Sequence, residues 1–369
     1  MFSFISCTKG TSGYNTRTMM NAHNIYIHVP FCISKCNYCA FFSRACATPD
    51  WEIYTNGILS EIDTWATRLG KISVPTIFFG GGTPSLMPTN YFAQIISHLC
   101  EKFDVLQNAE ITLESNPGTL DGARLREFIA NGVNRISIGV QSLNNEELSF
   151  MGRRHDVRTA LKLLDTAQST GIRVSADFIY GLPGHTSKSV EKLCHDINKL
   201  GLTHCSMYEL TIEPSTPFGK MNLDMPTNDE MADMYNAITN TLNLARYEVS
   251  NYATPGCECA HNQNIWDGAA YIGLGRGAAG RVFMNNTWYE QLGNNEKCEP
   301  MSPDARAVER VITGLRTSRG VLLAKDVLNV LNKKYINEHP ELVHIKGDRL
   351  IATDYGILVL DDLLVNVIN

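Results

Sequence analysis

Short apolar runs alternate with longer amphipathic stretches from residue 25 to about residue 248. Each run is rich in the β-branched and aromatic residues that favour β-strands. The runs are Ile25–Pro30, Thr76–Gly80, Glu110–Glu114, Arg135–Val140, Arg173–Ile179 and Ser206–Thr211. We therefore predict six strands in this part of the chain.

The stretches between these runs repeat apolar residues with the period of an α-helix. The predicted helices are Trp51–Leu69, Asn90–Lys102, Asp121–Ala130, Arg158–Ser169, Val190–Leu200 and, after the last strand, Asp229–Ala245. Strands that alternate with helices pair in parallel through right-handed crossovers. Six strands are fewer than the eight of a closed barrel, so the pattern predicts an α/β fold, a partial (β/α)6 barrel with one open side.

The alternation fades after Glu248, and composition divides the rest of the chain. Residues 249–300 are rich in Gly, Asn and Tyr and show little periodicity, so we expect an irregular segment there. Residues 301–369 contain helical patterns and a hairpin around Gly347, which predicts a small helical domain resembling a winged helix. Residues 1–24 contain no acidic residue and no long apolar stretch, and we expect a disordered leader before a barrel at residues 25–248.

The overall composition is that of an ordinary globular protein. The formal net charge of −6 offers no basic surface to nucleic acid, and no apolar run is long enough to span a bilayer. The eleven cysteines are odd in number and mostly scattered, which argues against a disulfide framework and for a reducing compartment. We expect a cytoplasmic protein without nucleic-acid partners.

Three cysteines lie together in "HVPFCISKCNYCAFF", just after the first predicted strand. In a parallel α/β barrel this position is at the carboxyl ends of the strands, where active sites are found. Cys32, Cys36 and Cys39 could hold a [4Fe–4S] cluster and leave one iron for the amino and carboxylate groups of S-adenosylmethionine. A zinc site with Cys46 or His28 as the fourth ligand is an alternative. A purely structural group of thiols serves no packing purpose.

Polar residues also stand at or just beyond the ends of several predicted strands. Gly80-Gly81-Gly82-Thr83 ends the second strand, where glycines let the backbone approach a ligand, although a tight turn explains the same residues. Glu114, Gln141 and Asp177 end the next three strands, and Arg153 follows in "MGRRHD". These side chains suit ribose hydroxyls and, for the guanidinium, a carboxylate. Each of them taken alone is more often a solvated surface residue.

The stretch "CAHNQNIW" contains a second candidate site. His261 is a suitable axial ligand for haem iron, and Trp266 could stack on a flat macrocycle. Two alternatives stay open, namely His261 as an ordinary hydrogen-bonded side chain, and Cys257 and Cys259 as thiolate ligands. The nearby "GRGAAG" fits a dinucleotide fingerprint, but no βαβ unit surrounds it, and we interpret it as a close backbone turn.

The stretch "YIHVPFCISKCNYCAFF" resembles the signature of radical SAM proteins related to oxygen-independent coproporphyrinogen III oxidase, and it is most similar to their haem-chaperone (HemW) branch. The resemblance continues in order through "FFGGGTPSLM", "ITLESNPGTL", "NRISIGVQSL", "DFIYGLPGHT", "ELTIEPSTPFG" and "CAHNQNIWDGAAYIGLG". It covers roughly residues 25–280 and is looser beyond them. It implies a radical SAM barrel, a [4Fe–4S] cluster, bound S-adenosylmethionine and haem.

The resemblance also implies roles for individual residues. It assigns Gly81, Gly82 and Thr83 to the amino end of S-adenosylmethionine, and it adds Tyr26, Tyr38 and, as an adenine contact, Thr211 to the same pocket. His261 matches the histidine of a His-Asn-x-x-Tyr-Trp motif tied to haem binding. Two departures from the family pattern are Ile265, which replaces the tyrosine of this motif, and Ala279, which stands where the family tends to carry a histidine.

Two functions follow from the resemblance, an oxidase of coproporphyrinogen III and a haem chaperone. The oxidases carry a further cysteine two residues after the third cluster ligand, where this chain has Phe41, and a longer segment before the cluster. Both features favour a haem chaperone that delivers haem to respiratory proteins. We expect a monomer or a dimer that reaches a membrane only through those partners. The loop is not a standard member of either branch, because Ala40 replaces the usual acidic residue.

Overall fold

The computed structural model describes residues 22–293 and 297–369. All six predicted strands are present, and they pair in parallel in the order in which they occur along the chain. They are β1 (His23–Val29), β4 (Ser73–Gly81), β5 (Asp104–Ser115), β6 (Arg135–Gln141), β7 (Arg173–Tyr180) and β8 (His204–Glu209). β5 begins before the predicted Glu110, because its polar first half pairs with the start of β4.

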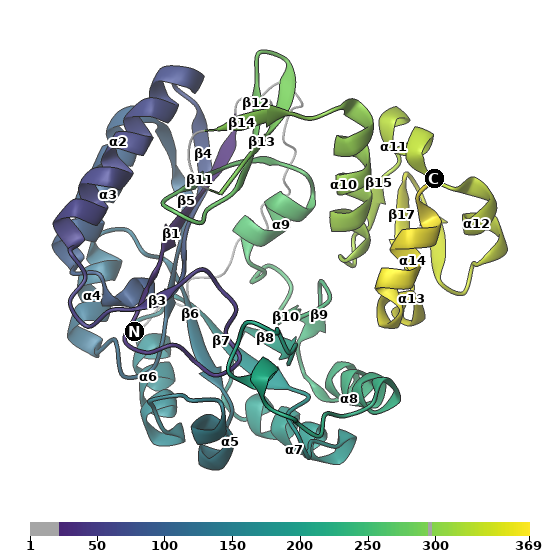
Figure 1. The fold of residues 1–369 in the computed structure, drawn as a ribbon, viewed down its shortest axis with the longest axis horizontal. Helices are drawn as coiled ribbons and strands as arrows, with labels where there is room; N and C mark the ends of the chain where they lie inside the picture. Colours follow the sequence, from purple (N-terminus) through teal and green to yellow (C-terminus); the bar gives the residue numbers. More distant parts are fainter. Residues whose placement is uncertain (1–21, 294–296) are drawn as a thin grey trace, which may run out of the picture.

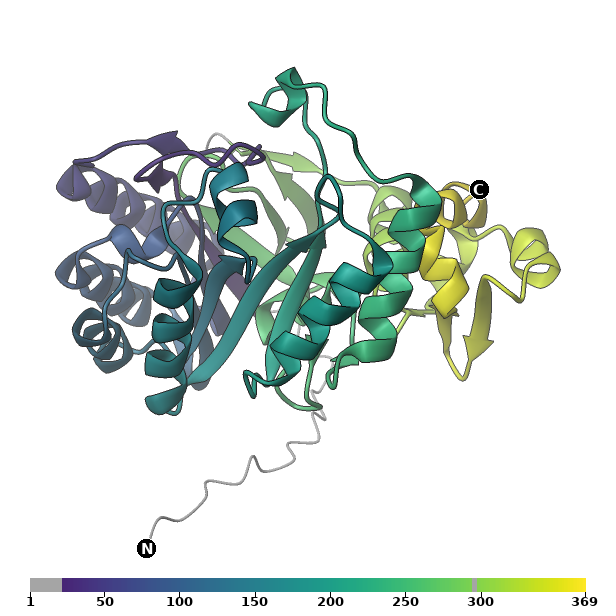
Figure 2. The same cartoon turned by 90° about the horizontal axis from the view of Figure 1, so that it is seen from below.

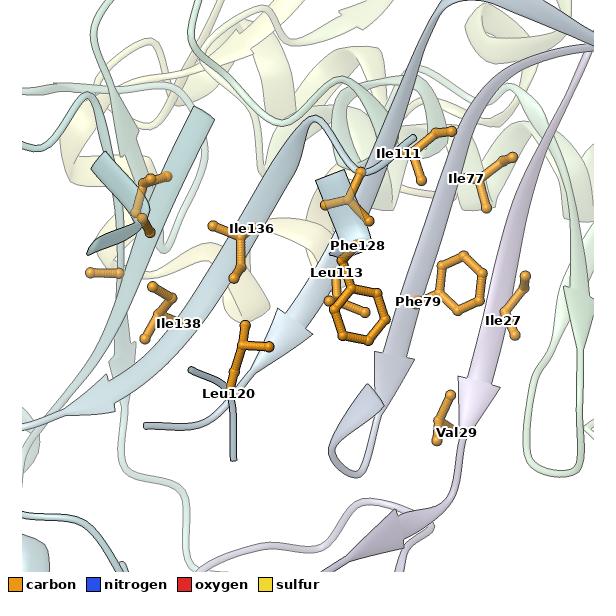
Figure 3. Close-up of a cluster of buried hydrophobic side chains, with 14 of the residues drawn as sticks. Ile27, Val29, Ile77, Phe79, Ile111, Leu113, Leu120, Phe128, Ile136 and Ile138 are labelled. Atoms are coloured by element: carbon orange, nitrogen blue, oxygen red, sulfur yellow. The ribbon is translucent and has the colours of Figure 1, made fainter. Parts of the chain in front are cut away.

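The two faces of this sheet differ in polarity, because alternate residues of a strand point to opposite faces. Figure 3 shows the apolar face, where side chains from β1, β4, β5 and β6 pack with Phe128 in the main hydrophobic core. The intervening residues, such as Tyr26, Glu114 and Arg135, line a cavity on the other face. A parallel sheet that is covered by helices on both faces carries apolar side chains on both faces. The polar alternation therefore marks the face that is available for a site.

Helices cover the apolar face of the sheet, as Figure 1 shows. The predicted helices are present as α2 (Trp51–Leu69), α3 (Thr89–Lys102), α4 (Gly122–Ala130), α6 (Val157–Ser169), α7 (Ser187–Asn198) and α8 (Asn228–Thr241). A further short helix, α5 (Asn145–Phe150), was not predicted. A side chain caps the start of each of these helices except α3. At α4, Asp121, predicted inside the helix, is the cap and accepts a hydrogen bond from the Arg124 N–H. None of the helices in the described ranges is long and apolar enough to cross a membrane.

The expectation of an irregular segment at residues 249–300 is wrong. This segment contains β10 (Asn251–Ala253), α9 (Ala260–Trp266), β11 (Ala270–Leu274), β12 (Gly280–Met284), β13 (Thr287–Gln291) and β14 (Cys298–Pro300). β11 pairs in parallel with β1 and adds a seventh parallel strand. Asn285 and Asn286, with φ of 50° and 58°, form the turn between β12 and β13. The strands are too short for their periodicity to stand out in the sequence.

These additions extend the sheet at both edges and leave it open. Its order in the described residues is β14-β13-β12-β11-β1-β4-β5-β6-β7-β8-β10-β9, with β9 at Ala245–Arg246. The predicted α/β class is therefore confirmed. The "GRGAAG" stretch joins the antiparallel strands β11 and β12 and opens no helix, which excludes the dinucleotide fingerprint.

The C-terminal residues form a second, smaller hydrophobic cluster. Its helices are α10 (Pro303–Leu315), α11 (Lys325–Val330), α12 (Lys333–Glu338), α13 (Asp354–Leu358) and α14 (Leu360–Val367). A sheet of β15 (Val321–Leu322), β17 (Arg349–Ala352) and β16 (Val343–Lys346) contains the predicted hairpin at Gly347, whose φ is 62°. Figures 1 and 2 place this part at one end of the molecule. An ion pair of Arg246 with Asp354, at 2.6 Å, links it to the end of the main sheet.

The predicted leader, residues 1–24, lies mostly outside the described residues, which begin at Ala22. Its last two residues, His23 and Asn24, belong to β1 and are buried. The first strand therefore begins two residues before the predicted start of the barrel at residue 25. Buried polar groups explain the error, because His23 and Asn24 break the apolar run that the pattern relies on.

Candidate functional site

The cysteine loop leaves the carboxyl end of β1, as predicted. It begins with β2 (Phe31–Cys32), which pairs with β3 (Arg44–Ala45). The backbone N–H of Thr83 donates to the carbonyl of Phe31 at 2.8 Å, so the loop is tied to the glycine turn after β4. All three cysteines of the loop are half-buried. Their thiols are thus close to solvent and held on ordered backbone.

Two side chains donate hydrogen bonds to thiols of this loop. Thr83 Oγ1 lies 3.6 Å from Cys32 Sγ, and Arg153 Nη1 lies 3.3 Å from Cys36 Sγ. Such donors stabilise thiolates and tune iron–sulfur clusters. Among the described residues, no three Cys, His, Asp or Glu side chains are arranged around a single metal ion. A cubane places each thiolate on a different iron, so its ligands need not converge on one point.

The proposed fourth ligands of a zinc site are engaged elsewhere. His28 Nδ1 lies 2.9 Å from the hydroxyl of Tyr26, and its Nε2 lies 2.7 Å from the carbonyl of Phe42. The Cys46 side chain packs against the main hydrophobic core. Both ring nitrogens of His28 are thus engaged, and no three side chains of the described residues converge on one metal ion, so the geometry favours a cluster over zinc.

The glycine turn after β4 lies directly against the cysteine loop. Gly81 has a φ of 109°, and a Cβ there would come within 2.6 Å of the His28 ring. A Cβ on Gly82 would come within 2.6 Å of the Phe31 carbonyl and 3.0 Å of Cys32 Sγ. Only glycine permits this approach. The turn therefore brings bare backbone to the cysteines, which is a suitable cradle for a small ligand.

The polar residues at the next strand ends come together as predicted. Glu114 accepts a hydrogen bond from the Gly81 N–H at 3.1 Å, and burial together with the nearby Asp177 raises the pKa of Glu114 to about 8. Burial also raises the pKa of Asp177, although Ser206 and Ser137 donate to it at 2.7 and 3.0 Å. These two acids lie on one cavity wall.

Arg153 is fixed between the cysteine loop and the strand ends. Its Nη2 donates to the carbonyl of Gly139 at 2.8 Å and to the Asn116 amide oxygen, while its Nη1 contacts Cys36. Gln141 is buried beside it at a bulge of β6, with a φ of 69° that is rare for a residue with a side chain. The structure thus places both predicted residues next to the cluster loop.

Tyr26, Tyr38 and Thr211, the further residues predicted for the S-adenosylmethionine pocket, lie in different places. Tyr26 lines the cavity, and Tyr38 hydrogen-bonds with Arg153 inside the cysteine loop. Thr211 is exposed beyond the end of β8 and does not line the cavity. The adenine contact of Thr211 stays a prediction, and the residue lies two positions beyond the end of β8 at Glu209.

A cavity of about 360 Å³ extends along the polar face of the sheet below the strand ends. It is lined by Tyr26, Phe78, Glu114, Arg135, Ser137, Asp177, Ser206, Tyr208, Asn251, His261, Asn262, Ile265, Tyr271 and Ala279. The cavity therefore joins residues predicted for the nucleoside with the histidine predicted for haem.

The hydrogen bonds of His261 define its tautomer. Thr76 Oγ1 lies 2.7 Å from both His261 Nδ1 and Asn24 Oδ1. The amide of Asn24 donates to the carbonyl of Ala270, which makes its Oδ1 an acceptor. The single hydroxyl proton of Thr76 goes to that acceptor, so His261 donates from Nδ1 and keeps its lone pair on Nε2. Nε2 has no hydrogen-bond partner among the described residues.

The surroundings of His261 keep its ring neutral. The residue is 2% exposed, and its ring lies 5.1 Å from that of Phe78, centroid to centroid. Burial lowers the pKa of His261 to about 4, against the opposing effect of Glu110. A neutral imidazole with a bare nitrogen on a cavity wall is able to bind a metal centre.

Glu110 holds the helix that carries His261. Its carboxylate accepts the backbone N–H of Ala260 at 3.0 Å and of His261 at 2.9 Å, at the start of α9. It also forms an ion pair with Arg173 at 3.0 Å. Burial favours a raised pKa of Glu110, but Arg135, Arg173 and these N–H groups outweigh it, so the pKa is lowered. An ionised carboxylate from β5 thus caps a helix that begins 150 residues later.

The cysteines near His261 do not line the cavity. Cys259 is fully buried with its thiol towards Glu110, and burial raises the pKa of Cys259 to about 12. Cys257 does not line the cavity. Trp266 lies outside the cavity lining as well, with the Arg316 guanidinium 5.3 Å above its ring. The predicted stacking role of Trp266 is therefore not supported.

Comparisons with known proteins agree with this geometry. The family model of the Radical SAM superfamily matches residues 26–197. Heme chaperone HemW of Escherichia coli strain K12 is 38% identical over 267 residues, 70% of each chain. The HemW of Lactococcus lactis is 29% identical and covers 94% of this chain and 99% of its own. The chain belongs to the HemW-like family of radical SAM proteins.

A solved structure with the same fold is coproporphyrinogen III oxidase (HemN) from Escherichia coli. It aligns with a TM-score of 0.77 at 21% identity and covers 94% of this chain and 89% of its own. At this identity the likeness shows the fold alone. The radical SAM family implies a [4Fe–4S] cluster and S-adenosylmethionine, and the thiols, the glycine turn and the donors around them fit both groups.

The departures of this HemW-like chain from the family pattern lie at two places. Ile265 and Ala279 both line the cavity with His261 and give it apolar wall where larger polar side chains are usual. Ala40, in place of the usual acidic residue, is exposed. The departures therefore affect the cavity and the loop tip, and they leave the three cluster thiols in place.

Three supporting residues were missed by the sequence reasoning, namely Asn116, Glu110 and Arg135. A signal for two of them was present. Polar or charged residues occur at every second position within apolar strands, as in Glu110, Thr112 and Glu114 of β5. A buried parallel strand tolerates such residues only where they line a polar cavity. Asn116 follows its strand in a loop and had no such signal.

Proposed function

We propose that this chain is a haem chaperone that binds haem in the cavity through His261, carries a [4Fe–4S] cluster with S-adenosylmethionine, and delivers haem to respiratory proteins. The observation that carries the proposal is the buried, neutral His261 with a bare Nε2 on the cavity wall. The names of its HemW relatives support the same reading.

In this proposal Cys32, Cys36 and Cys39 hold the cluster at the carboxyl ends of the strands. The turn Gly81–Thr83, Glu114, Gln141, Arg153 and Asp177 bind S-adenosylmethionine beside it. When bound to a reduced cluster, S-adenosylmethionine supplies a 5′-deoxyadenosyl radical. The chain itself positions the ligand: Arg153 orients the Cys36 thiolate, and Glu114 fixes the glycine turn through the Gly81 N–H.

Haem binding follows from the way in which the imidazole is held. A metal-binding histidine is oriented by the hydrogen bond from its other ring nitrogen. Thr76 provides that bond at 2.7 Å, and the packing of Phe78 fixes the plane of the ring. Haem iron accepts a neutral imidazole without loss of a proton, so His261 needs no rearrangement to bind it.

Haem titration followed by the Soret band tests the proposal. We expect wild type and Cys259→Ala to give the same imidazole-ligated spectrum, because the Cys259 thiol stays protonated. His261→Ala should lose that spectrum. Equal binding by all three proteins would remove His261 as the ligand, and loss of the spectrum only in Cys259→Ala would favour a thiolate.

The alternative function is that of an oxygen-independent oxidase of coproporphyrinogen III, since the chain shares its fold with HemN, a coproporphyrinogen III oxidase. The exposed Phe41 in place of a cysteine argues against it. Anaerobic incubation with reductant and S-adenosylmethionine should leave coproporphyrinogen III unchanged. Sustained conversion to protoporphyrinogen would overturn the chaperone proposal.

The setting of this function is also part of the proposal. The free cysteines of the described residues suit a reducing compartment, and we propose the cytoplasm. Haem transfer needs a haem-accepting respiratory protein as partner, and the formal charge of −6 gives no reason to expect nucleic acid. Size-exclusion chromatography with light scattering would distinguish the monomer from the dimer.

A further inference from the structure

Arg135 is a buried cation that faces the cavity. It is the first residue of β6, is 3% exposed, and lines the cavity together with His261. A guanidinium carries five N–H donors. Within residues 22–293 and 297–369, the Arg135 side chain has no hydrogen bond and no ion pair. Burying a charged group that makes no hydrogen bonds costs free energy, unless a bound ligand accepts hydrogen bonds from that group.

The acidic groups near Arg135 have other hydrogen-bond donors. The groups within electrostatic reach are Cys259, Glu110, Tyr247 and Asp177. Glu110 is satisfied by the start of α9 and by its ion pair with Arg173. Asp177 accepts hydrogen bonds from serine hydroxyls. Arg135 therefore balances part of their charge at a distance while its own donors remain open to the cavity.

We propose that Arg135 binds a carboxylate of the ligand in this cavity. The cavity is then a two-point site, in which His261 Nε2 binds iron and Arg135 binds a carboxylate side chain of the same tetrapyrrole. A guanidinium offers the forked geometry that a carboxylate prefers. This inference rests on the proposed function and adds to it the part of the ligand that is recognised.

The other walls of the cavity suit such a ligand. The ring of Phe78 and the side chains of Ile265 and Ala279 provide apolar surface for a flat macrocycle. The pKa of Glu114, raised to about 8 by burial and by Asp177, keeps this cavity acid mostly protonated at pH 7. An incoming carboxylate thus meets one open cation and little repulsion from Glu114.

The test compares iron protoporphyrin IX with its dimethyl ester, which lacks the negative charges. We expect wild type to bind the free acid about 10- to 100-fold more tightly than the ester, the range of a hydrogen bond to a charged group. Arg135→Gln should bind both compounds equally and keep the imidazole-ligated Soret band. Arg154→Gln, a matched change of an exposed arginine, should keep the wild-type preference.

Metal-free protoporphyrin IX and its dimethyl ester separate this inference from the haem proposal. His261→Ala should lose the iron-dependent band yet still prefer the metal-free acid to its ester. Equal binding of acid and ester by wild type would overturn the inference, and this holds even if Arg135→Gln does not fold. A preference that survives in folded Arg135→Gln would also overturn it. Failure of iron protoporphyrin to ligate His261 would instead overturn the proposed function.

Discussion

The cysteine loop and the His261 end of the cavity lie on the same face of one sheet but are built differently. The loop takes its three thiols from a short stretch of chain, leaves them half-buried and fixes them through backbone hydrogen bonds. His261 is 2% exposed and depends on Asn24, Thr76 and Glu110, all distant in sequence. A local motif thus defines one end of the site, and tertiary packing defines the other.

The largest effect that separates the two ends is expected for Cys36→Ala. A cluster that loses one of three thiolates should not assemble, so iron, sulfide and S-adenosylmethionine binding should be lost. Folding and the haem spectrum should persist, because Cys36 belongs neither to the hydrophobic core nor to the cavity wall. Iron and sulfide analysis after anaerobic reconstitution measures the first part, and haem titration measures the second.

Cys100→Ala is the matched control, since Cys100 is an exposed cysteine of α3. It should keep the full iron content. Loss of the haem spectrum in folded Cys36→Ala would show that the two ends depend on each other and would contradict the comparison.

The substitution Glu110→Gln should affect the His261 end of the site and leave the iron–sulfur cluster intact. Glu110→Gln removes the charge opposite Arg173 and weakens the cap of α9. We expect the free energy of unfolding to fall by about 3 kcal/mol, the low end for a broken buried ion pair, because Arg173 is partly exposed. The haem spectrum should weaken as α9 loosens, while the iron content stays normal. Urea denaturation and haem titration measure these effects.

The control for this variant is Glu101→Gln, which changes an exposed acid on α3. Its stability should match that of wild type. If Glu110→Gln were as stable as wild type with an unchanged haem spectrum, the carboxylate would have no role in positioning His261.

The sequence predicted the two ends of the site with unequal success. The cysteine loop and the strand ends were predicted because each strand brings its own last residue to the same edge of a parallel sheet. Glu110 and Arg135 were missed, because the helix start that Glu110 caps and part of the cavity that Arg135 lines come from residues 249–300, which were expected to be irregular. The end of β8 was predicted at Thr211, two residues beyond its observed end at Glu209. Long-range partners are what a local pattern cannot define.

Arg153→Ala tests how far the strand ends contribute to ligand binding at the cluster. The guanidinium contacts Cys36 and, in the proposed function, pairs with the carboxylate of S-adenosylmethionine. Its loss should weaken S-adenosylmethionine binding by about 1.5–3 kcal/mol. Anaerobic calorimetry on the reconstituted protein measures this change. Arg154→Ala, the exposed neighbour, should leave the affinity unchanged, and an equal loss in both variants would point to a general charge effect.

The smallest effect concerns the response of the His261 end to acid. Because the folded pKa of about 4 lies below the usual value of His261, 6.5, the neutral ring stabilises the fold above pH 6.5, and this contribution is lost as the pH falls from 6.5 towards 4. At pH 5.5 the loss from this residue should be about 1 kcal/mol, measured as the difference in pH dependence between wild type and His261→Gln. Haem ligation should persist at pH 5.5, since the folded ring is still unprotonated. A Soret band that disappears with a midpoint near pH 6.5 would mean that the ligand is a solvated histidine, and the contrast between a buried end and an accessible end of the site would no longer hold.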